Sequence, residues 1–310
     1  MIGRVYTLIS KNATAVGYVG VLMWALTATF TAELSTLPVF EILSIAFSIN
    51  FSISFLRISL GNKWQQLRQP IGLWVLGIIG IFGNEMLYIM AFKHAPPAHA
   101  DLINYLWPIM VIFLSSVILK EALSLKHIIA GLLGFFATYL LITNGQGLAG
   151  FHSEYAWGYV FAFCSALSWS LYTLVGKKYG ETIPEIIGIY CGIGMLCSLI
   201  LHVQLEPNVV PTLTQWIVLL LMGLTTHGLA YFFWNHGVKL GNYRLLSVMC
   251  YANPIISVSL LVFLGFAQPS ASLWTSAALV SLAGLVGTLN WRTKSQYCMK
   301  QWRKMRHREK

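Results

Sequence analysis

The chain has 310 residues, of which 57% are hydrophobic and only 10% carry a charge, and its mean hydropathy is +0.69. A soluble domain carries roughly 25% charged residues, so this composition excludes a single soluble core and makes the lipid bilayer the solvent for much of the surface. The formal net charge of +10 fits either a nucleic acid or an anionic membrane as partner, and the positions of the basic residues decide between them.

Apolar stretches of about 20 residues, the length that crosses a bilayer core of roughly 30 Å, recur along the whole chain. We therefore predict an all-α integral membrane protein with ten transmembrane helices. In chain order the predicted spans are 13–31, 37–58, 71–92, 99–119, 125–143, 155–176, 184–204, 213–236, 245–264 and 271–291. The first stretch is too long for a cleaved signal peptide and lacks a small-residue cleavage site after it.

The loops between these spans predict the orientation, because cytoplasmic loops carry an excess of Lys and Arg. With the N-terminus inside, 19 of the 20 basic residues fall on the inside, and only Lys93 lies in an outside loop. Both termini are therefore predicted to be cytoplasmic. The charge is spread over several loops and one tail without a motif for reading bases, which indicates the lipid bilayer as partner and no nucleic acid.

The one long polar connection, at residues 144–154, contains three glycines and falls near the middle of the chain. We predict that it is an outer linker between a first five-span repeat at 1–143 and a second five-span repeat at 155–291. A basic cytoplasmic tail at 292–310 follows, which is either an interfacial helix on anionic lipid or a topology signal.

A recurring motif supports the repeat. Tyr105 and Pro108 form a Tyr-x-x-Pro sequence in the fourth span, and Tyr251 and Pro254 form the same sequence 146 residues later, in the ninth. A proline inside a span kinks the helix and frees backbone carbonyls to face a cavity, although kinks also serve packing. Because five is an odd number, the second repeat must be inverted, and transporters built this way bind substrate near the midplane where the repeats meet.

Ionisable side chains within spans are costly, so each is a candidate functional group. Glu85 in the third span shares a helical stripe with Tyr88, and it either balances a substrate cation, takes up a proton, or is hydrogen-bonded for packing. Trp24 and Trp169 lie deep in the first and sixth spans at matching repeat positions. Their indole N–H groups need partners, which a polar cavity supplies if the rings do not simply fill the core.

Two other spans carry polar and aromatic residues on adjoining stripes. In the fourth span the kink presents a wall of such side chains, and in the eighth span a histidine is followed by aromatic residues at helical spacing. A lone histidine in a membrane helix is more often packed than a ligand. The candidate substrate-binding residues are Trp24, Glu85, Tyr88, Asn104, Tyr105, Trp107, Pro108, Trp169, His227, Trp234, Asn235 and Tyr251.

Other polar residues receive no role from the sequence. Asp101 lies near the outer end of the fourth span and is expected to be solvated, and Glu41 in the second span is expected to snorkel or pair. The pairs Gly17 with Gly20 and Gly131 with Gly134 permit close approach of helices, which makes them packing devices.

The sequence predicts no enzyme, no cofactor and no metal site. The five cysteines show no paired spacing, and those in apolar runs are expected to act as small hydrophobes. Phosphate-binding glycine loops, zinc motifs and nucleophile elbows are absent from the sequence. No spacing pairs a nucleophile with a base.

The order of spans, the basic inside loops and the sequence Leu119-Lys120-Glu121-Ala122-Leu123-Ser124 before the fifth span resemble the EamA-type drug/metabolite transporter superfamily. Asn104-Tyr105-Leu106-Trp107-Pro108 and Trp234-Asn235-His236-Gly237 are similar to the bacterial aromatic amino acid exporter branch. This resemblance implies a bacterial inner-membrane exporter of Phe, Tyr and Trp with a central cavity lined by spans 1, 3, 4, 6, 8 and 9.

We therefore expect a small-molecule exporter that works by alternating access around an aromatic cavity near the midplane, as a monomer or weak homo-oligomer. One alternative is a proton-coupled exporter of cationic drugs or other metabolites, with Glu85 as proton carrier. A further alternative is a membrane sensor or scaffold that transports nothing.

Overall fold

The computed structural model describes residues 12–120, 122–179, 183–241, 246 and 249–288, and these form helices and turns without a β-strand. Within this part of the chain, seven helical stretches are long and apolar enough to cross a membrane: Ala13–Glu33, Val39–Leu60, Ile71–His94, Pro97–Ile118, Leu125–Ile142, Ile186–Leu205 and Leu213–Gly237. Two shorter apolar helices, Cys250–Phe263 and Ala271–Gly287, follow. The chain is thus an all-helical membrane protein, while the count of ten spans, the inverted halves and the orientation of the termini stay predictions. The predicted tail at 292–310 lies outside the described residues.

Within the described ranges, five long helices run without interruption: α4 (Val39–Leu60), α9 (Leu125–Ile142), α10 (Ala156–Tyr179), α11 (Ile186–Leu205) and α16 (Ala271–Thr288). Other helices are joined end to end: α2 (Ala13–Ala25) with α3 (Thr27–Glu33), α5 (Ile71–Ile78) with α6 (Asn84–His94), α7 (Pro97–Asn104) with α8 (Trp107–Ile118), and α12 (Leu213–Leu224) with α13 (Ala230–Leu240). Short 3₁₀ turns complete the described elements: η1 (Trp64–Leu67), η3 (Gly147–Gly150), η4 (Ser153–Tyr155) and η6 (Cys250–Ala252), the last of which precedes α15 (Asn253–Phe263).

The breaks have local causes. Pro108 and Pro254 each occupy the first turn of a new helix, where the missing N–H costs nothing, and the preceding helix or turn ends before them. Two further interruptions are π-helical turns, η2 (Ile79–Gly83) and η5 (Thr225–Leu229). These turns begin 146 residues apart, the same separation as the two Tyr-x-x-Pro motifs. The coincidence supports the proposed repeat.

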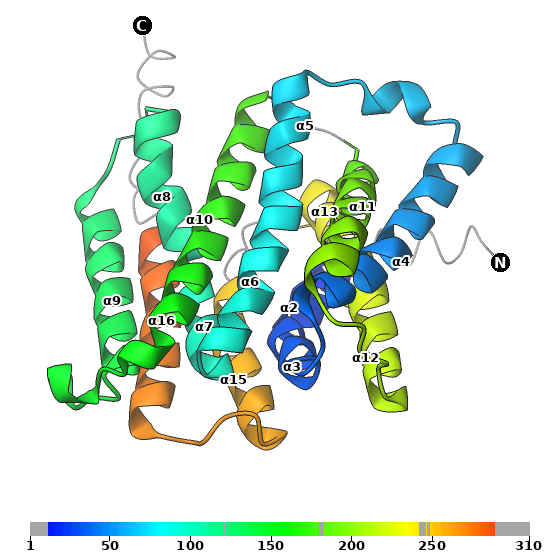
Figure 1. Cartoon of the computed structure of the whole chain (residues 1–310). Coiled ribbons are helices and arrows are strands. Elements are labelled where there is room, and N and C mark those ends of the chain that lie inside the picture. The colour runs from blue at the N-terminus through cyan, green and yellow to red at the C-terminus, as the bar shows by residue number, and fades with distance from the viewer. Residues whose placement is uncertain (1–11, 121, 180–182, 242–245, 247–248, 289–310) are drawn as a thin grey trace, which may run out of the picture.

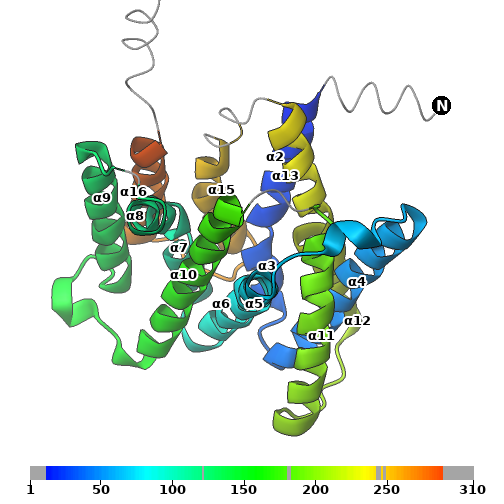
Figure 2. The same cartoon turned by 90° about the horizontal axis from the view of Figure 1, so that it is seen from above.

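The helices gather into two groups (Figure 1). α8, α9 and α16 pack together at one side, and α4, α11 and α12 pack together at the other. The view from above keeps the same division, with α2, α13 and α15 between the two groups (Figure 2). Each group has its own apolar core, and α6 contributes to both, through Tyr88 on one side and Ile89 on the other.

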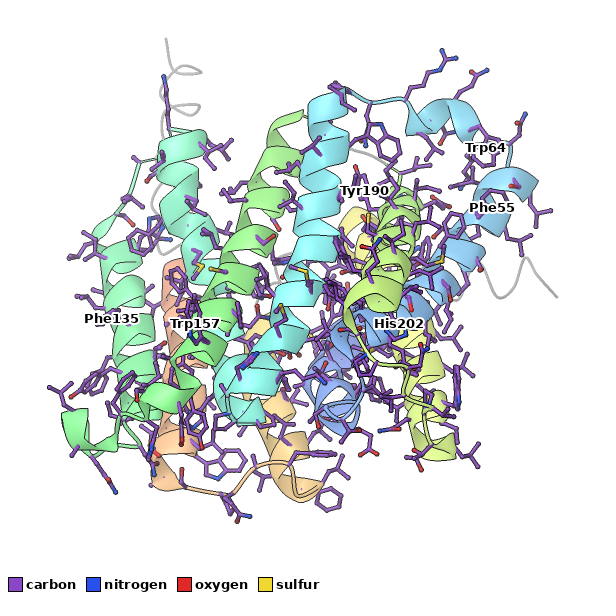
Figure 3. All side chains as sticks on the ribbon, in the orientation of Figure 1. Phe55, Trp64, Phe135, Trp157, Tyr190 and His202 are labelled. Atoms are coloured by element: carbon purple, nitrogen blue, oxygen red, sulfur yellow. The ribbon has the colours of Figure 1, made fainter. Side chains whose placement is uncertain are left out.

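Large apolar side chains cover the outside of the helices. Phe135 of α9 is 77% exposed and points away from the bundle (Figure 3), and Trp157 of α10 is 67% exposed. Exposed apolar surface of this extent is costly in water and favourable against lipid tails. The outer surface is therefore suited to a bilayer.

α2 and α13 approach closely at glycines, as the spacing of Gly17 and Gly20 predicts. A Cβ atom added at Gly17 would lie 2.8 Å from the Cα of Gly237, and one at Gly20 would lie 2.7 Å from the carbonyl oxygen of Ala230. Because backbone atoms cannot move aside cheaply, Gly17→Val should lower the free energy of unfolding in detergent by about 1–3 kcal/mol. Gly72→Val is the control, since no atom lies within 4 Å of its added Cβ. Equal thermal unfolding of both variants would contradict this packing.

An ion-pair cluster joins the end of α4 to the start of α11. The carboxylate of Glu185, which lies immediately before α11, is 2.7 Å from the ammonium of Lys63 and 3.2 Å from the guanidinium of Arg57. Burial acts to raise the pKa of Glu185, but the hydrogen bond from Lys63 and the two positive charges outweigh it and hold the pKa below the ordinary value of 4.5.

This cluster predicts a pH dependence of stability. A carboxyl whose pKa is lower in the folded state stabilises it above the unfolded pKa, and the contribution is lost as the pH falls through the folded pKa. Glu185→Gln should therefore melt at a lower temperature than the wild type at pH 7, with a smaller difference at pH 4. Melting curves of both proteins across this range test it, and a constant difference would contradict it.

Candidate functional site

A cavity of about 380 Å³ lies where the helix breaks meet. Its volume falls in the range of roughly 300–1,000 Å³ that is typical of small-molecule sites. Residues from both halves of the chain line it: Trp24, Thr27, Asn84, Glu85, Tyr88, Asp101, Asn104, Tyr105, Trp107, Pro108, Val111, Ile112, Trp169, Thr173, Tyr231, Trp234, Cys250, Tyr251, Asn253, Pro254, Val280 and Gly284.

An aromatic wall runs along this cavity. Trp24 contacts Trp234 and Tyr231, with ring centroids 5.7 Å and 5.4 Å away, and Tyr231 in turn lies 6.2 Å from Trp169. Trp169 meets Trp107 edge to face at 6.5 Å. Tilted and edge-to-face pairs are favourable arrangements of aromatic rings, and they fix the rings of α2, α8, α10 and α13 relative to one another. The wall therefore spans both halves of the chain.

The interrupted helices position this wall. The indole N–H of Trp24 donates to the backbone carbonyl of Thr226 at 3.2 Å, within the π-helical turn η5. The polar partner of this partly buried indole is therefore a backbone carbonyl of the interrupted helix. At the start of α15, the side-chain amide of Asn253 donates to the backbone carbonyl of Val21 at 2.9 Å, and this bond links α15 to α2.

Asp101 is buried, and the expectation that solvent surrounds it was wrong. Its side chain is held beneath α15, where one carboxylate oxygen accepts a 2.8 Å hydrogen bond from the hydroxyl of Tyr88 and the other accepts a 2.6 Å bond from the hydroxyl of Ser257. Two hydroxyl donors compensate part of the cost of burying a carboxylate. Asp101 therefore adds a carboxylate to the cavity wall that the sequence reasoning placed in solvent.

A small polar network joins three helices beside the cavity. The hydroxyl of Ser165 on α10 lies 2.9 Å from the amide oxygen of Asn84 and 3.1 Å from that of Asn104. The hydroxyl of Ser165 has one hydrogen, so it can donate to only one of these two amide oxygens at a time. The side-chain amides of Asn84 and Asn104 therefore keep hydrogen-bonding capacity for a ligand.

Glu85 lines the cavity and is backed by His227. The Nε2 atom of His227 is 3.2 Å from a carboxylate oxygen of Glu85, and the amide of Asn84 donates to the other oxygen at 3.3 Å. From the sequence, His227 could be either a packed side chain or a ligand. It lies behind Glu85, outside the residues that line the cavity.

All the other predicted site residues line the cavity except Asn235, whose amide donates to the carbonyl of Tyr231 one turn earlier, at 2.9 Å. The residues that the prediction omitted include Asp101, Tyr231 and Asn253. Tyr231 follows His227 by one helical turn and Asn253 directly precedes a motif proline, so both carried a spacing signal that could have identified them.

The charged side chains that line the cavity in the described part of the chain are all acidic. Among the described residues that line the cavity, Glu85 and Asp101 are acidic, and none is Lys or Arg. Aromatic faces and carboxylates both attract a cationic group, so the cavity suits a ligand that combines a ring with an ammonium.

The family model described as the EamA-like transporter family matches residues 13–143 and 156–290. The chain is 34% identical over 280 residues to the aromatic amino acid exporter YddG of Ancylobacter novellus, covering 90% of this chain and 98% of that protein. It is 24% identical over 285 residues to the aromatic amino acid exporter YddG of Escherichia coli K12, covering 87% and 94% of the two chains. A solved crystal structure, 33% identical, superposes with a TM-score of 0.69 over 90% of this chain and 96% of that chain.

Proposed function

Because the chain belongs to the EamA-like transporter family and is a transporter rather than an enzyme, we propose that it exports amino acids across the bacterial inner membrane. We propose aromatic amino acids as its substrates, since relatives at 34% and 24% identity are named aromatic amino acid exporters. The substrate binds in the cavity between the helix breaks and leaves it by alternating access.

The observation that carries this proposal is the aromatic wall. Trp24, Trp107, Trp169, Tyr231 and Trp234 come from both halves of the chain and border one cavity. Each stacked aromatic pair contributes about 0.5–1.5 kcal/mol beyond the buried area, which supports binding weak enough to permit release. Residues from both halves make one site, so a movement of one half against the other opens and closes it.

Two features support the inverted-repeat arrangement of this proposal. The π-helical turns and the Tyr-x-x-Pro motifs share one separation along the chain, and the family model matches one stretch on each side of the predicted linker. With ten spans and both termini inside, the halves face the membrane in opposite directions. Helix breaks at corresponding positions then give each half a hinge of the same kind.

The acidic lining favours a second candidate, an exporter of cationic metabolites or drugs. Glu85 and Asp101 attract a cation, and the described lining offers no basic side chain for a substrate carboxylate. In the amino acid proposal, the side-chain amides of Asn84 and Asn104 bind the substrate carboxylate instead. The two candidates therefore differ in how much the substrate carboxylate contributes to binding.

Counterflow in liposomes tests both candidates. Purified protein is reconstituted, the vesicles are loaded with unlabelled phenylalanine, and uptake of external labelled phenylalanine is followed at equal pH on both sides. We expect uptake well above that of empty vesicles, and competition by tryptophan and tyrosine. Exchange of labelled phenethylamine in vesicles loaded with phenethylamine, without exchange of labelled phenylalanine, would favour the cation exporter, and no exchange of either labelled compound would contradict a transporter of either kind.

A further inference from the structure

We propose that a second cavity, at the end of the molecule predicted to face outside, binds the exported aromatic amino acid after it leaves the central cavity, which the aromatic wall borders. This inference rests on the proposed export function and adds a second site for the same substrate. The second cavity, the outer pocket, has a volume of about 400 Å³. Its lining includes His99, Asn144, His152, Tyr155, Tyr159 and Gln268.

The outer pocket follows the central cavity along the same helices. Among the described residues, none lines both. On α10, Tyr159 lines the outer pocket and Trp169 the central cavity, about 15 Å apart along the helix axis. On α16, Leu273 and Val280 do the same at a separation of about 10 Å. A substrate that leaves the central cavity along these helices therefore reaches the outer pocket.

The segments around the outer pocket lie together at one end of the molecule. Figure 1 shows the start of α7, the linker between α9 and α10, and the loop between α15 and α16 at this end. The linker joins the two predicted halves of the chain, and α7 and α16 come from different halves. The outer pocket is thus bordered by both halves, as the central cavity is.

Small side chains separate the two cavities. Ala162 of α10 and Ala277 of α16 lie between the two levels, and both are fully buried. They belong to the same apolar core as Tyr159 and Leu273. Because alanine fills little of the space between helices, a small shift of one helix against the other opens a passage here without a change of side-chain rotamer.

Four rings form one wall of the outer pocket. His99 lies nearly parallel to Tyr159, with ring centroids 6.0 Å apart and an angle of 25° between the planes. Tyr155 lies 6.3 Å from Tyr159, and His152 lies 5.8 Å from Tyr155. Aromatic rings pack favourably against the faces and edges of other rings. The outer pocket therefore suits the side chain of an aromatic amino acid.

This wall is held in shape by the protein itself. Nδ1 of His99 lies 3.1 Å from the hydroxyl of Tyr159, and this hydrogen bond fixes both rings relative to each other. A Cβ atom added at Gly150 would overlap the carbonyl oxygen of Thr143, so the linker folds back tightly on the end of α9. The outer pocket is therefore formed before a ligand enters it, as most small-molecule sites are.

The outer pocket differs from the central cavity in charge. None of the described residues that line it is Asp, Glu, Lys or Arg, whereas Glu85 and Asp101 border the central cavity. A substrate that moves outward loses its ionic partners, and the amides of Asn144 and Gln268 are neutral donors for its carboxylate. Hydrogen bonds from neutral groups are weaker than ion pairs. Weak binding suits a site from which the substrate is released to water.

Photolabelling locates the bound substrate. Purified wild-type protein is illuminated in detergent with para-azidophenylalanine, an aromatic amino acid that attaches to nearby residues in light, and mass spectrometry of the peptides locates the adducts. We expect adducts on residues of the central cavity and on residues of the outer pocket, and excess phenylalanine should suppress both sets. Trp169→Ala should lose the central adducts and keep the outer ones.

A variant that fills the outer pocket tests its part in transport. Gln268→Trp places a ring in the pocket from an exposed position of the loop before α16. We expect the outer adducts to fall by at least about tenfold and phenylalanine counterflow to slow, with the central adducts unchanged. Gln146→Trp is the matched control and should behave like the wild type, because Gln146 is an exposed glutamine of the linker that does not line the pocket.

The outcomes separate this site from the proposed function. Three results would each overturn the outer pocket as a transit site and leave export intact: no outer adducts in the wild type, outer adducts that excess phenylalanine does not suppress, or counterflow at the wild-type rate in Gln268→Trp. A lack of counterflow by the wild type would overturn the proposed function itself. If Gln268→Trp does not fold, the adducts of the wild type and of Trp169→Ala still decide whether the outer pocket binds the substrate.

Discussion

Alanine in place of Trp169 is expected to lower the efflux of labelled phenylalanine from loaded liposomes by at least about thirtyfold, at substrate concentrations below saturation. Trp169 lies at the centre of the aromatic wall, between the rings of Tyr231 and Trp107. Truncating a large aromatic anchor of a binding site costs about 2 kcal/mol or more, and this cost appears directly in the rate when most of the transporter is empty. Trp107→Ala is expected to have a comparable effect.

A second tryptophan of the same helix provides the control. Trp157 is 67% exposed on the outside of α10 and does not line the cavity, so Trp157→Ala should export phenylalanine at the wild-type rate. Insertion and folding are checked for each variant by the yield of monodisperse protein in detergent. Normal efflux by both Trp169→Ala and Trp107→Ala would contradict the placement of the substrate in this cavity.

Helical periodicity and the predicted repeat indicated many of the residues that line the cavity. Trp24 and Trp169 stood at matching positions of two spans, and the Tyr-x-x-Pro motifs marked breaks where a helix turns its polar groups inward. Both kinds of signal are local, since they depend on spacing along one helix or on a separation between two. These signals marked Tyr88, Trp107 and Tyr251 as candidates, and the resemblance to the transporter superfamily implied the central cavity that all three residues line.

The contacts that depend on packing could not be predicted in the same way. Asp101 lies near a span end, and its sequence position does not reveal that α15 covers it and supplies Ser257 as a donor. His227 is equally ambiguous, because its partner Glu85 is far away in the sequence and on another helix. In both cases the role of an ionisable group is set by its neighbour from a different helix, which one sequence does not identify. The π-helical turns were not anticipated either.

Asp101→Asn is expected to weaken phenylalanine binding by roughly tenfold to a hundredfold, the loss of one hydrogen bond to a charged group at about 1.5–3 kcal/mol. The carboxylate of Asp101 borders the cavity, and its two hydroxyl donors, Tyr88 and Ser257, hold it in place. Asparagine keeps the shape of the side chain but removes the negative charge that attracts a substrate ammonium. The concentration of phenylalanine that half-saturates counterflow measures the change.

A second ligand and a control variant distinguish the effect of removing the Asp101 charge from a general loss of packing. N-acetylphenylalanine lacks the ammonium, so its weak competition should change little in Asp101→Asn, and the preference for phenylalanine over it should shrink. Glu41→Gln neutralises another buried carboxyl, on α4, that does not line the cavity, and it should leave half-saturation unchanged. An unaltered preference in Asp101→Asn would show that the ammonium pairs elsewhere, and Glu85 would then be the one carboxylate of the described lining left to receive it.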